Sequence, residues 1–386
     1  MRLGDLITRV FPAGCEIAPA HAVPPSQRFA IIPGGDGPRW IMPVACRHSE
    51  KVLRQWSPLG ALARAQWRIA MTAHRLNRIA WVPRTVIVGV ANFDPSSWRK
   101  AGLTACADAV PVVYVARPSA TQKAVVSLLS AGSGKIDRVI KIALGPAAWP
   151  FIERDYCNLQ AVDMFCAGLA PKPLGLFPDC RMSSQEWIAG KTSLHLSPQS
   201  MPAFLMMLWR PDRTTLRELA QRYRARFDVL PRDDIAGWFE RMIDSIQCDD
   251  DVPRAFHHGD FAAWNLIRQV NGGWRAVDWE FGDCDGAPLF DLFHFLLSRT
   301  LANGRLVSFQ AASRSTLDAH DRIVRLFLNR LGASYRYARD ALTLTFVSLY
   351  LTRFNSAWTS ERLLPQLRAV AGSFAAGTTA RRTSAH

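Results

Sequence analysis

Several features are missing from this sequence, and each absence excludes a class of protein. The eight cysteines are widely spaced, with no Cys-x-x-Cys pair and no Cys/His cluster at zinc-ligand spacing. We therefore expect reduced, mostly buried thiols. No run of about 18 apolar residues occurs, and the N-terminus has no apolar core of signal-peptide length. The sequence thus predicts a cytoplasmic protein without a transmembrane segment.

Acidic residues are scarce, above all at the front of the chain. The 386 residues include 47 Lys or Arg and 32 Asp or Glu, a net charge of +15. Residues 1–107 hold 14 of the Lys or Arg and 5 of the Asp or Glu, a net charge of +9. This excess suits phosphorylated ligands, an anionic surface or nucleic acid, but arginines scattered over a solvated face give the same sum. An anionic surface or a protein partner for residues 1–107 stays open, and no aromatic-basic module predicts specific nucleic-acid binding.

The length allows two or three domains, and the order of elements suggests their boundaries. We expect a basic accessory region of unknown role over 1–107, a β-rich part over 108–190, a mainly helical part over 191–376 and a disordered tail over 377–386. Strands are predicted at 28–33, 39–44, 81–90, 110–116, 124–129 and 138–144. Helices are predicted at 59–76, 149–161, 213–227, 234–247, 288–300, 314–331, 339–357 and 361–375.

The segment 256–292 carries the strongest chemical signal. Two glycines follow Asn271 and indicate a hairpin. If they form a two-residue loop, Asn271 pairs with Trp274 and Asn265 stands opposite Glu280. Asp278 then lies diagonal to Asn265, within about 7–8 Å. An amide oxygen and a carboxylate at that separation can share a magnesium ion whose other positions are filled by nucleotide phosphates.

Asp260 lies on the loop before this hairpin, five residues ahead of Asn265. In that position it can accept the proton of an attacking hydroxyl. His258 is better suited to brace the loop than to titrate. Taken singly, these residues also fit turns, caps and strand edges. The prediction depends on the whole set in this order.

The joint pattern resembles the aminoglycoside phosphotransferase and choline-kinase superfamily, small-molecule relatives of the protein kinases. It consists of His-Gly-Asp, an Asn five residues after the Asp, a hydrophobic-Asp-Trp-Glu strand, a Gly/Pro turn and Asp-Leu. The matching residues are His258, Gly259, Asp260, Asn265, Asp278, Glu280, Pro288 and Asp291. The resemblance implies an α+β, protein-kinase-like bilobal fold, with a small antiparallel β lobe and a mainly helical lobe. Residues 1–107 lie outside it, as an extra N-terminal α/β accessory region.

By this resemblance Asp260 is the catalytic base, Asn265 and Asp278 hold Mg²⁺, and Asp291 anchors the catalytic loop from a helix start. Lys141 stands alone in an apolar β-rich run, where it must find a partner or keep its head in water. In a kinase it would reach the ATP phosphates and pair with a Glu of the next helix. Glu153 is the first candidate for that partner and Asp155 the second.

The remaining nucleotide contacts are predicted on two connections. The turn 116–122, which includes Ser119 and Thr121, would cover the phosphates, although it has no glycine. The linker 185–190, with Glu186 and Ile188, would offer backbone groups to the adenine. These residues predict an ATP- and Mg²⁺-dependent phosphotransferase acting on a hydroxyl of a sugar, an aminoglycoside or an amino alcohol. The alternative is a weak or inactive pseudokinase that acts as a binding or scaffold protein.

Overall fold

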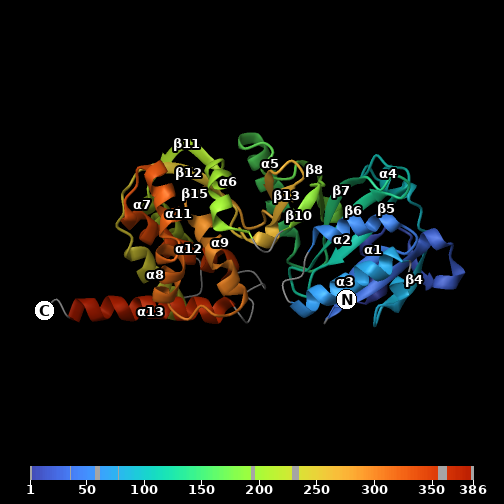
Figure 1. Cartoon of the computed structure of the whole chain (residues 1–386), viewed down its shortest axis with the longest axis horizontal. Coiled ribbons are helices and arrows are strands. Elements are labelled where there is room, and N and C mark those ends of the chain that lie inside the picture. The colour runs from blue at the N-terminus through green and yellow to red at the C-terminus, as the bar shows by residue number, and fades with distance from the viewer. Residues whose placement is uncertain are drawn as a thin grey trace. The chain divides into compact units, whose positions relative to one another are not determined.

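The computed structural model describes residues 2–34, 36–56, 61–76, 78–192, 196–227, 234–354 and 363–383. The chain forms two compact units. We call them the sheet unit, Met1–Leu194 with Leu266–Val277, and the helical unit, His195–Asn265 with Asp278–His386. Figure 1 labels most of their elements, and each unit is described by itself.

The sheet unit is built on one antiparallel sheet of nine strands, in the order β1-β4-β2-β3-β5-β6-β7-β9-β8. The strands are β1 (Glu16–Pro19), β2 (Arg28–Gly34), β3 (Gly37–Pro43), β4 (Val86–Ala91), β5 (Ala109–Val115), β6 (Lys123–Ser130), β7 (Ile136–Ala143), β8 (Pro173–Phe177) and β9 (Met182–Glu186). The helices are α1 (Leu3–Val10), α2 (Glu50–Gln55), α3 (Ala61–Arg75), α4 (Ser96–Lys100) and α5 (Trp149–Phe165). A small second sheet joins β10 (Gly190–Thr192), β13 (Leu266–Gln269) and β14 (Trp274–Ala276).

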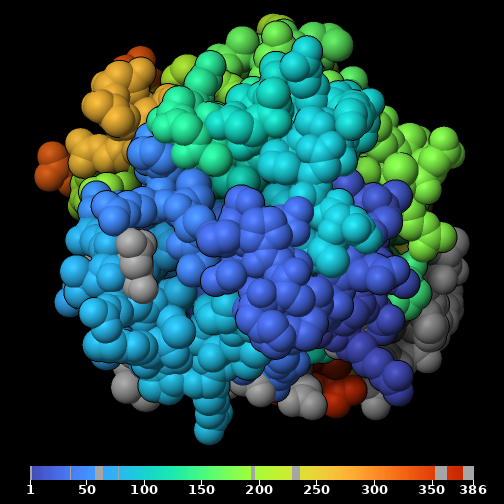
Figure 2. Space-filling model, turned by 90° about the vertical axis from the view of Figure 1, so that its right-hand side faces the viewer, coloured from blue at the N-terminus to red at the C-terminus, as the bar shows by residue number. Residues whose placement is uncertain are grey.

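The N-terminal residues belong to the same sheet as the predicted small lobe. β3 pairs with β5, with Trp40 opposite Tyr114 and Ile41 opposite Val113. One core cluster includes side chains from both regions, among them the fully buried Phe29. N-terminal residues, blue to cyan, also make up much of the face shown in Figure 2. The boundary expected at 107/108 therefore falls inside a continuous sheet, because cross-strand pairing continues through it.

The helical unit packs its helices around an aromatic core. Phe239 and Tyr350 lie stacked with ring centroids 4.4 Å apart, and Phe227 also stacks on Tyr350 at 5.8 Å. Its helices are α6 (Pro202–Met206), α7 (Leu216–Phe227), α8 (Asp234–Asp244), α9 (Phe290–Ala302), α10 (Phe309–Ser313), α11 (Asp321–Leu331), α12 (Tyr335–Phe354) and α13 (Leu363–Thr383). A three-stranded sheet of β11 (Trp209–Thr214), β12 (Val252–His257) and β15 (Asp283–Gly286) completes it.

The predicted fold class is confirmed in its main features. An antiparallel β part is followed by a mainly helical part, and the predicted strands and helices occur near their expected positions. The helix expected at 314–331 is divided into a π-helical turn (Arg314–Asp318) and α11. The predicted tail differs, because α13 continues through Thr383, and only 384–386 lie outside the described residues. The predicted ends of three helices, at 59–60, 355–357 and 361–362, also lie outside them. Within the described chain, none of the helices has the length and apolar character needed to cross a bilayer.

The shared sheet makes residues 1–107 necessary for folding. Deleting them would expose the edge of β5 and remove the partners of buried side chains such as Val113. We expect residues 108–386 alone to be insoluble or to melt without a cooperative transition, as measured by circular dichroism beside the full chain. A sharp melt close to that of the full chain would contradict the shared core.

Candidate active site

A buried aspartate fixes the backbone of the His-Gly-Asp loop, which follows β12. Asp291, in the first turn of α9, is 6% exposed. Its carboxylate accepts the N–H of His258 at 2.7 Å and the N–H of Gly259 at 3.2 Å. His257 Nε2 lies 3.3 Å from the same carboxylate. Hydrogen bonds to a charged acceptor are the strong ones, so Asp291 anchors the loop from a helix start.

Glycine and histidine in this loop each meet a steric demand. Gly259 has φ +75°, and a Cβ there would lie 2.2 Å from the carbonyl oxygen of Phe281, so only glycine fits. The ring of His258 is fully buried and lies 4.6 Å from the ring of Trp279. Its Nδ1 accepts the N–H of Asp260 at 3.2 Å. These contacts fit the bracing role expected of His258.

Asn265 holds the carboxylate of Asp260 in place. Its Nδ2 donates to the main-chain carbonyl of Asp260 and to Oδ2 of the same residue, each at 2.9 Å. The side chain of Asp260 remains 21% exposed, whereas Asn265 is buried. Asp260 is therefore a fixed carboxylate that a ligand can still reach. Because both of these hydrogen bonds use Nδ2 of Asn265, its amide oxygen can serve as a ligand atom.

The predicted hairpin register is wrong. The expected two-residue loop placed Asn265 opposite Glu280. The structure instead pairs Arg268 with Trp274 and leaves five residues between them. The wider turn has a local cause, since Asn271 Oδ1 accepts the backbone N–H two residues further on, at 3.2 Å.

In the observed register, the two expected metal ligands still lie at the two ends of the same hairpin. The last strand pair is Leu266 with Ala276. Asn265 precedes this pair by one residue and Asp278 follows it by two, so both flank the base of one hairpin. Asp278 has φ +65°, a left-handed conformation that is costly for a residue other than glycine. Backbone strain of this kind collects at functional sites.

The donors at this position suit magnesium. Mg²⁺ prefers oxygen ligands and is usually held by one or two carboxylates together with substrate phosphates. The carboxylate of Asp278 and the amide oxygen of Asn265 are both hard oxygen donors. The hydrogen bonds from Nδ2 to Asp260 fix which end of the Asn265 amide is left for a cation. The residues present therefore fit the ion that the resemblance implies.

His294 completes this cluster and was missed from the sequence. It is 5% exposed, its Nδ1 lies 3.0 Å from the carbonyl oxygen of Phe261, and its Nε2 lies 3.6 Å from Oδ1 of Asp260. A carbonyl only accepts, so Nδ1 carries the proton in this contact. The spacing between Asp291 and His294 could have indicated it. His294 stands three residues after Asp291 on α9, so both side chains project from the same side of the helix.

A second group of predicted residues lies in the sheet unit, and one of its pairings needs correction. Lys141 Nζ lies 2.8 Å from Oδ2 of Asp155, and both side chains are at least 96% buried. Glu153, the expected partner, is exposed. The reason is helical phase: the buried stripe of α5 includes Ile152, Asp155 and Leu159, and Glu153 points about 200° away from Asp155. This i, i+3, i+7 spacing was visible in the sequence.

Asp155 and Glu153 provide a matched pair of variants. Asp155→Asn breaks the buried ion pair with Lys141, a change that typically costs about 3–5 kcal/mol of unfolding free energy. Glu153→Gln changes an exposed side chain and should cost less than about 0.5 kcal/mol. Urea unfolding of both variants measures the difference. Equal stabilities would contradict the pairing.

The turn between β5 and β6 contains Ser119 and Thr121, whose hydroxyl oxygens are 3.4 Å apart. Backbone hydrogen bonds hold the turn against the connection from β7 to α5. The carbonyl of Ala120 accepts the N–H of Ala147, and the carbonyl of Gln122 accepts the N–H of Gly145. The approach is close enough that a Cβ on Gly145 would lie 2.2 Å from the carbonyl oxygen of Ala120. The turn is therefore fixed by backbone hydrogen bonds, although it has no glycine of its own.

The predicted adenine linker is partly engaged by other groups of the sheet unit. The carbonyl of Ile188 accepts a hydrogen bond from Gln55 Nε2 at 2.6 Å. The carboxylate of Glu186 is 2.7 Å from Arg275 and accepts the N–H of Lys172 at 3.3 Å. The C-terminal end of α2 therefore holds the linker in place.

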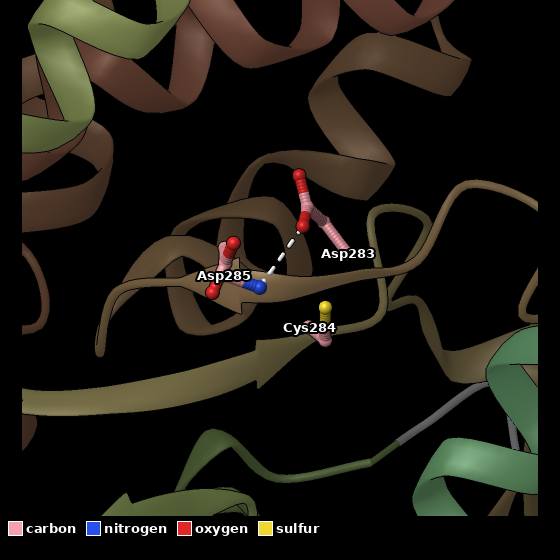
Figure 3. A group of neighbouring side chains, drawn as sticks. All are labelled: Asp283, Cys284 and Asp285. Carbon is pink, nitrogen blue, oxygen red and sulfur yellow. Dashed lines mark hydrogen bonds between the residues drawn. The ribbon is translucent and has the colours of Figure 1, made fainter. Parts of the chain in front are cut away.

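An acidic cluster outside these groups is explained by ion pairs. Figure 3 shows Asp283, Cys284 and Asp285 on β15, with Asp283 accepting the N–H of Asp285 at 2.9 Å. The carboxylate of Asp285 lies 2.8 Å from both Arg222 and Arg254. Partial desolvation and then the two carboxylates raise the pKa of the Cys284 thiol, which disfavours the thiolate that binds metals. We assign no metal to this cluster.

No protein-family model matches the sequence, and no curated protein matches it. Solved structures do. Those similar to this chain include small-molecule kinases and phosphotransferases. A provisionally named aminoglycoside phosphotransferase from Ralstonia eutropha is 15% identical, with a TM-score of 0.43, and the match covers 73% of this chain and 97% of that one.

Two further structures are similar. Choline kinase from Streptococcus pneumoniae is 16% identical, with a TM-score of 0.39, and covers 66% of this chain and 89% of its own. Plasmodium vivax ethanolamine kinase is 12% identical, with a TM-score of 0.40, over 68% and 81%. These names agree with the superfamily that the sequence resembles. All three TM-scores lie below 0.5, so the function proposed next rests on this chain's own residues.

Proposed function

We propose that the protein is an ATP- and Mg²⁺-dependent phosphotransferase that transfers the γ-phosphate to a hydroxyl of a small molecule, such as a sugar, an aminoglycoside or an amino alcohol. The observation that supports this most directly is the clamp on Asp260. Its carboxylate is fixed by Asn265 Nδ2 and faces His294 Nε2, yet it remains accessible. A binding protein has no physical need for an accessible, oriented carboxylate beside two oxygen ligands.

Asp260 acts as the base in this proposal. One of its carboxylate oxygens accepts the proton as the substrate's hydroxyl oxygen forms a bond to the γ-phosphorus and the bond to the β-phosphate oxygen breaks, which leaves ADP. The hydrogen bonds from Asn265 hold this carboxylate in a fixed orientation for the hydroxyl. Asp291 and His258 hold the loop during the transfer, since their contacts are to its backbone.

Asn265 and Asp278 are assigned to magnesium, and Lys141 to the nucleotide phosphates. Bound Mg²⁺ would neutralise charge on the phosphate oxygens. Lys141 contributes a positive charge whose position is set by Asp155. Ser119 and Thr121 offer hydroxyl groups from the fixed turn to the phosphates. The linker with Glu186 and Ile188 is assigned to adenine binding. These roles are part of the proposal.

Nucleotide binding is tested by thermal shift. ATP with Mg²⁺ at about one hundred times Kd should stabilise the wild type by about 2.7 kcal/mol. Asp278→Ala should lose the magnesium-dependent part of the shift, because it removes a charged ligand. Asp321→Ala is the matched control, since Asp321 pairs only with Arg325 on α11 among the described residues. If ATP and Mg²⁺ do not raise the melting temperature of the wild type, the proposal is wrong.

Turnover is tested by ADP release with a panel of sugars, aminoglycosides and amino alcohols. Asp260→Asn should lower the rate with any accepted substrate by about 10²–10⁴-fold, because it removes the base but keeps the shape. Its thermal shift with ATP should remain. Undiminished turnover would remove Asp260 from its assigned role. A normal ATP shift without turnover on any substrate would favour the pseudokinase alternative.

A further inference from the structure

Exposed apolar side chains gather in one short stretch of the sheet unit. Large apolar residues are normally exposed singly over a protein surface, so a cluster needs an explanation. Between α3 and the start of β4, four of them occur within 18 consecutive residues. They are Ile69, Leu76, Trp81 and Val86, which are 59%, 65%, 71% and 55% exposed.

The exposed side of α3 faces outward because the helix packs its other side against the core. Ile69 and Leu76 are seven residues apart, so they lie on the same side of the helix, about 10 Å from each other. The other side carries Ala70 and His74, which are buried at 4% and 1% exposure. Trp67 also faces inward and packs on Trp40 at 5.1 Å. The core of this region is therefore complete without Ile69 and Leu76.

The same part of the chain is rich in positive charge. Residues 51–93 contain seven Lys or Arg and no Asp or Glu. Arg68 and Arg84 are exposed and make no ion pair within the described residues. The guanidinium of Arg78 lies 4.2 Å from the centre of the Trp81 ring, at the outer surface. Two of the seven, Arg54 and Arg75, are paired with Glu50.

We call this surface the 69–86 face, defined by Arg68, Ile69, Leu76, Arg78, Trp81, Arg84 and Val86. We propose that the 69–86 face docks the protein on the surface of an anionic lipid bilayer. Aliphatic and tryptophan side chains enter the boundary between headgroups and acyl chains, while arginines contact lipid phosphates. Nucleic acid would match the charge, but acyl chains bury aliphatic side chains such as Ile69, Leu76 and Val86 more fully than its polar surface does. This proposal does not depend on the proposed phosphotransferase activity.

The test is cosedimentation of the full chain with vesicles of phosphatidylcholine alone or mixed with phosphatidylglycerol. We expect binding to the mixed vesicles only. Raising NaCl from about 0.1 M to about 1 M should weaken it, because the screening length falls from about 10 Å to about 3 Å. Arg68→Gln with Arg84→Gln should weaken binding about tenfold or more. Ile69→Ser with Leu76→Ser and Trp81→Ser should do the same.

The control variant is Met164→Ser with Val307→Ser, which removes apolar side chains that are 76% and 68% exposed elsewhere. It should bind vesicles as the wild type does. Because every substituted side chain is exposed, the variants should keep the wild-type melting temperature, which circular dichroism checks.

Three results would overturn the proposal. The first is a wild type that binds no vesicles or binds both kinds equally, and the second is unchanged binding in both 69–86 variants. The third is a different occupant of the face. Binding of a labelled single-stranded RNA that only the arginine variant loses would assign it to nucleic acid. A dimer in light scattering that the serine variant abolishes would assign it to a second copy of the chain.

Discussion

The carboxylate of Asp291 is the point on which the candidate site depends. It is buried, it accepts two successive backbone N–H groups of the His-Gly-Asp loop, and it lies beside His257. The left-handed turn at Gly259 brings Asp260 back toward Asn265, and this turn is held by those same bonds. Removing the carboxylate would leave buried N–H groups without acceptors, so the loop would lose the geometry on which all the proposed chemistry rests.

The sheet unit follows a similar physical logic with a different group. Lys141 is buried inside an apolar sheet, where an unpaired ammonium would be very costly. Asp155 supplies the compensating charge from the buried stripe of α5, so the ion pair also sets the rotation of that helix against β7. An aspartate, and not the expected glutamate, pairs with Lys141, and its shorter side chain still reaches the ammonium group at 2.8 Å.

Residues 1–107 contribute to the sheet unit in three physical ways. Their strands extend the sheet through the pairing of β3 with β5. The side chain of Gln55, at the end of α2, holds the carbonyl of Ile188. The 69–86 face carries exposed apolar and basic groups. A region with no catalytic signature in its sequence is thus part of the core, a support for the linker and the candidate docking surface.

The sequence alone determined which residues form the loop of Asp260 and Asn265, because His-Gly-Asp, the Asn and the following Asp-Trp-Glu are local patterns. It also determined the antiparallel and helical halves through their periodicities. Tertiary structure decided the rest. The hairpin register depends on a turn that Asn271 widens, and the partner of Lys141 depends on which side of α5 meets the sheet. His294 reaches Asp260 only when α9 packs on the loop, a distance between elements that sequence spacing does not carry.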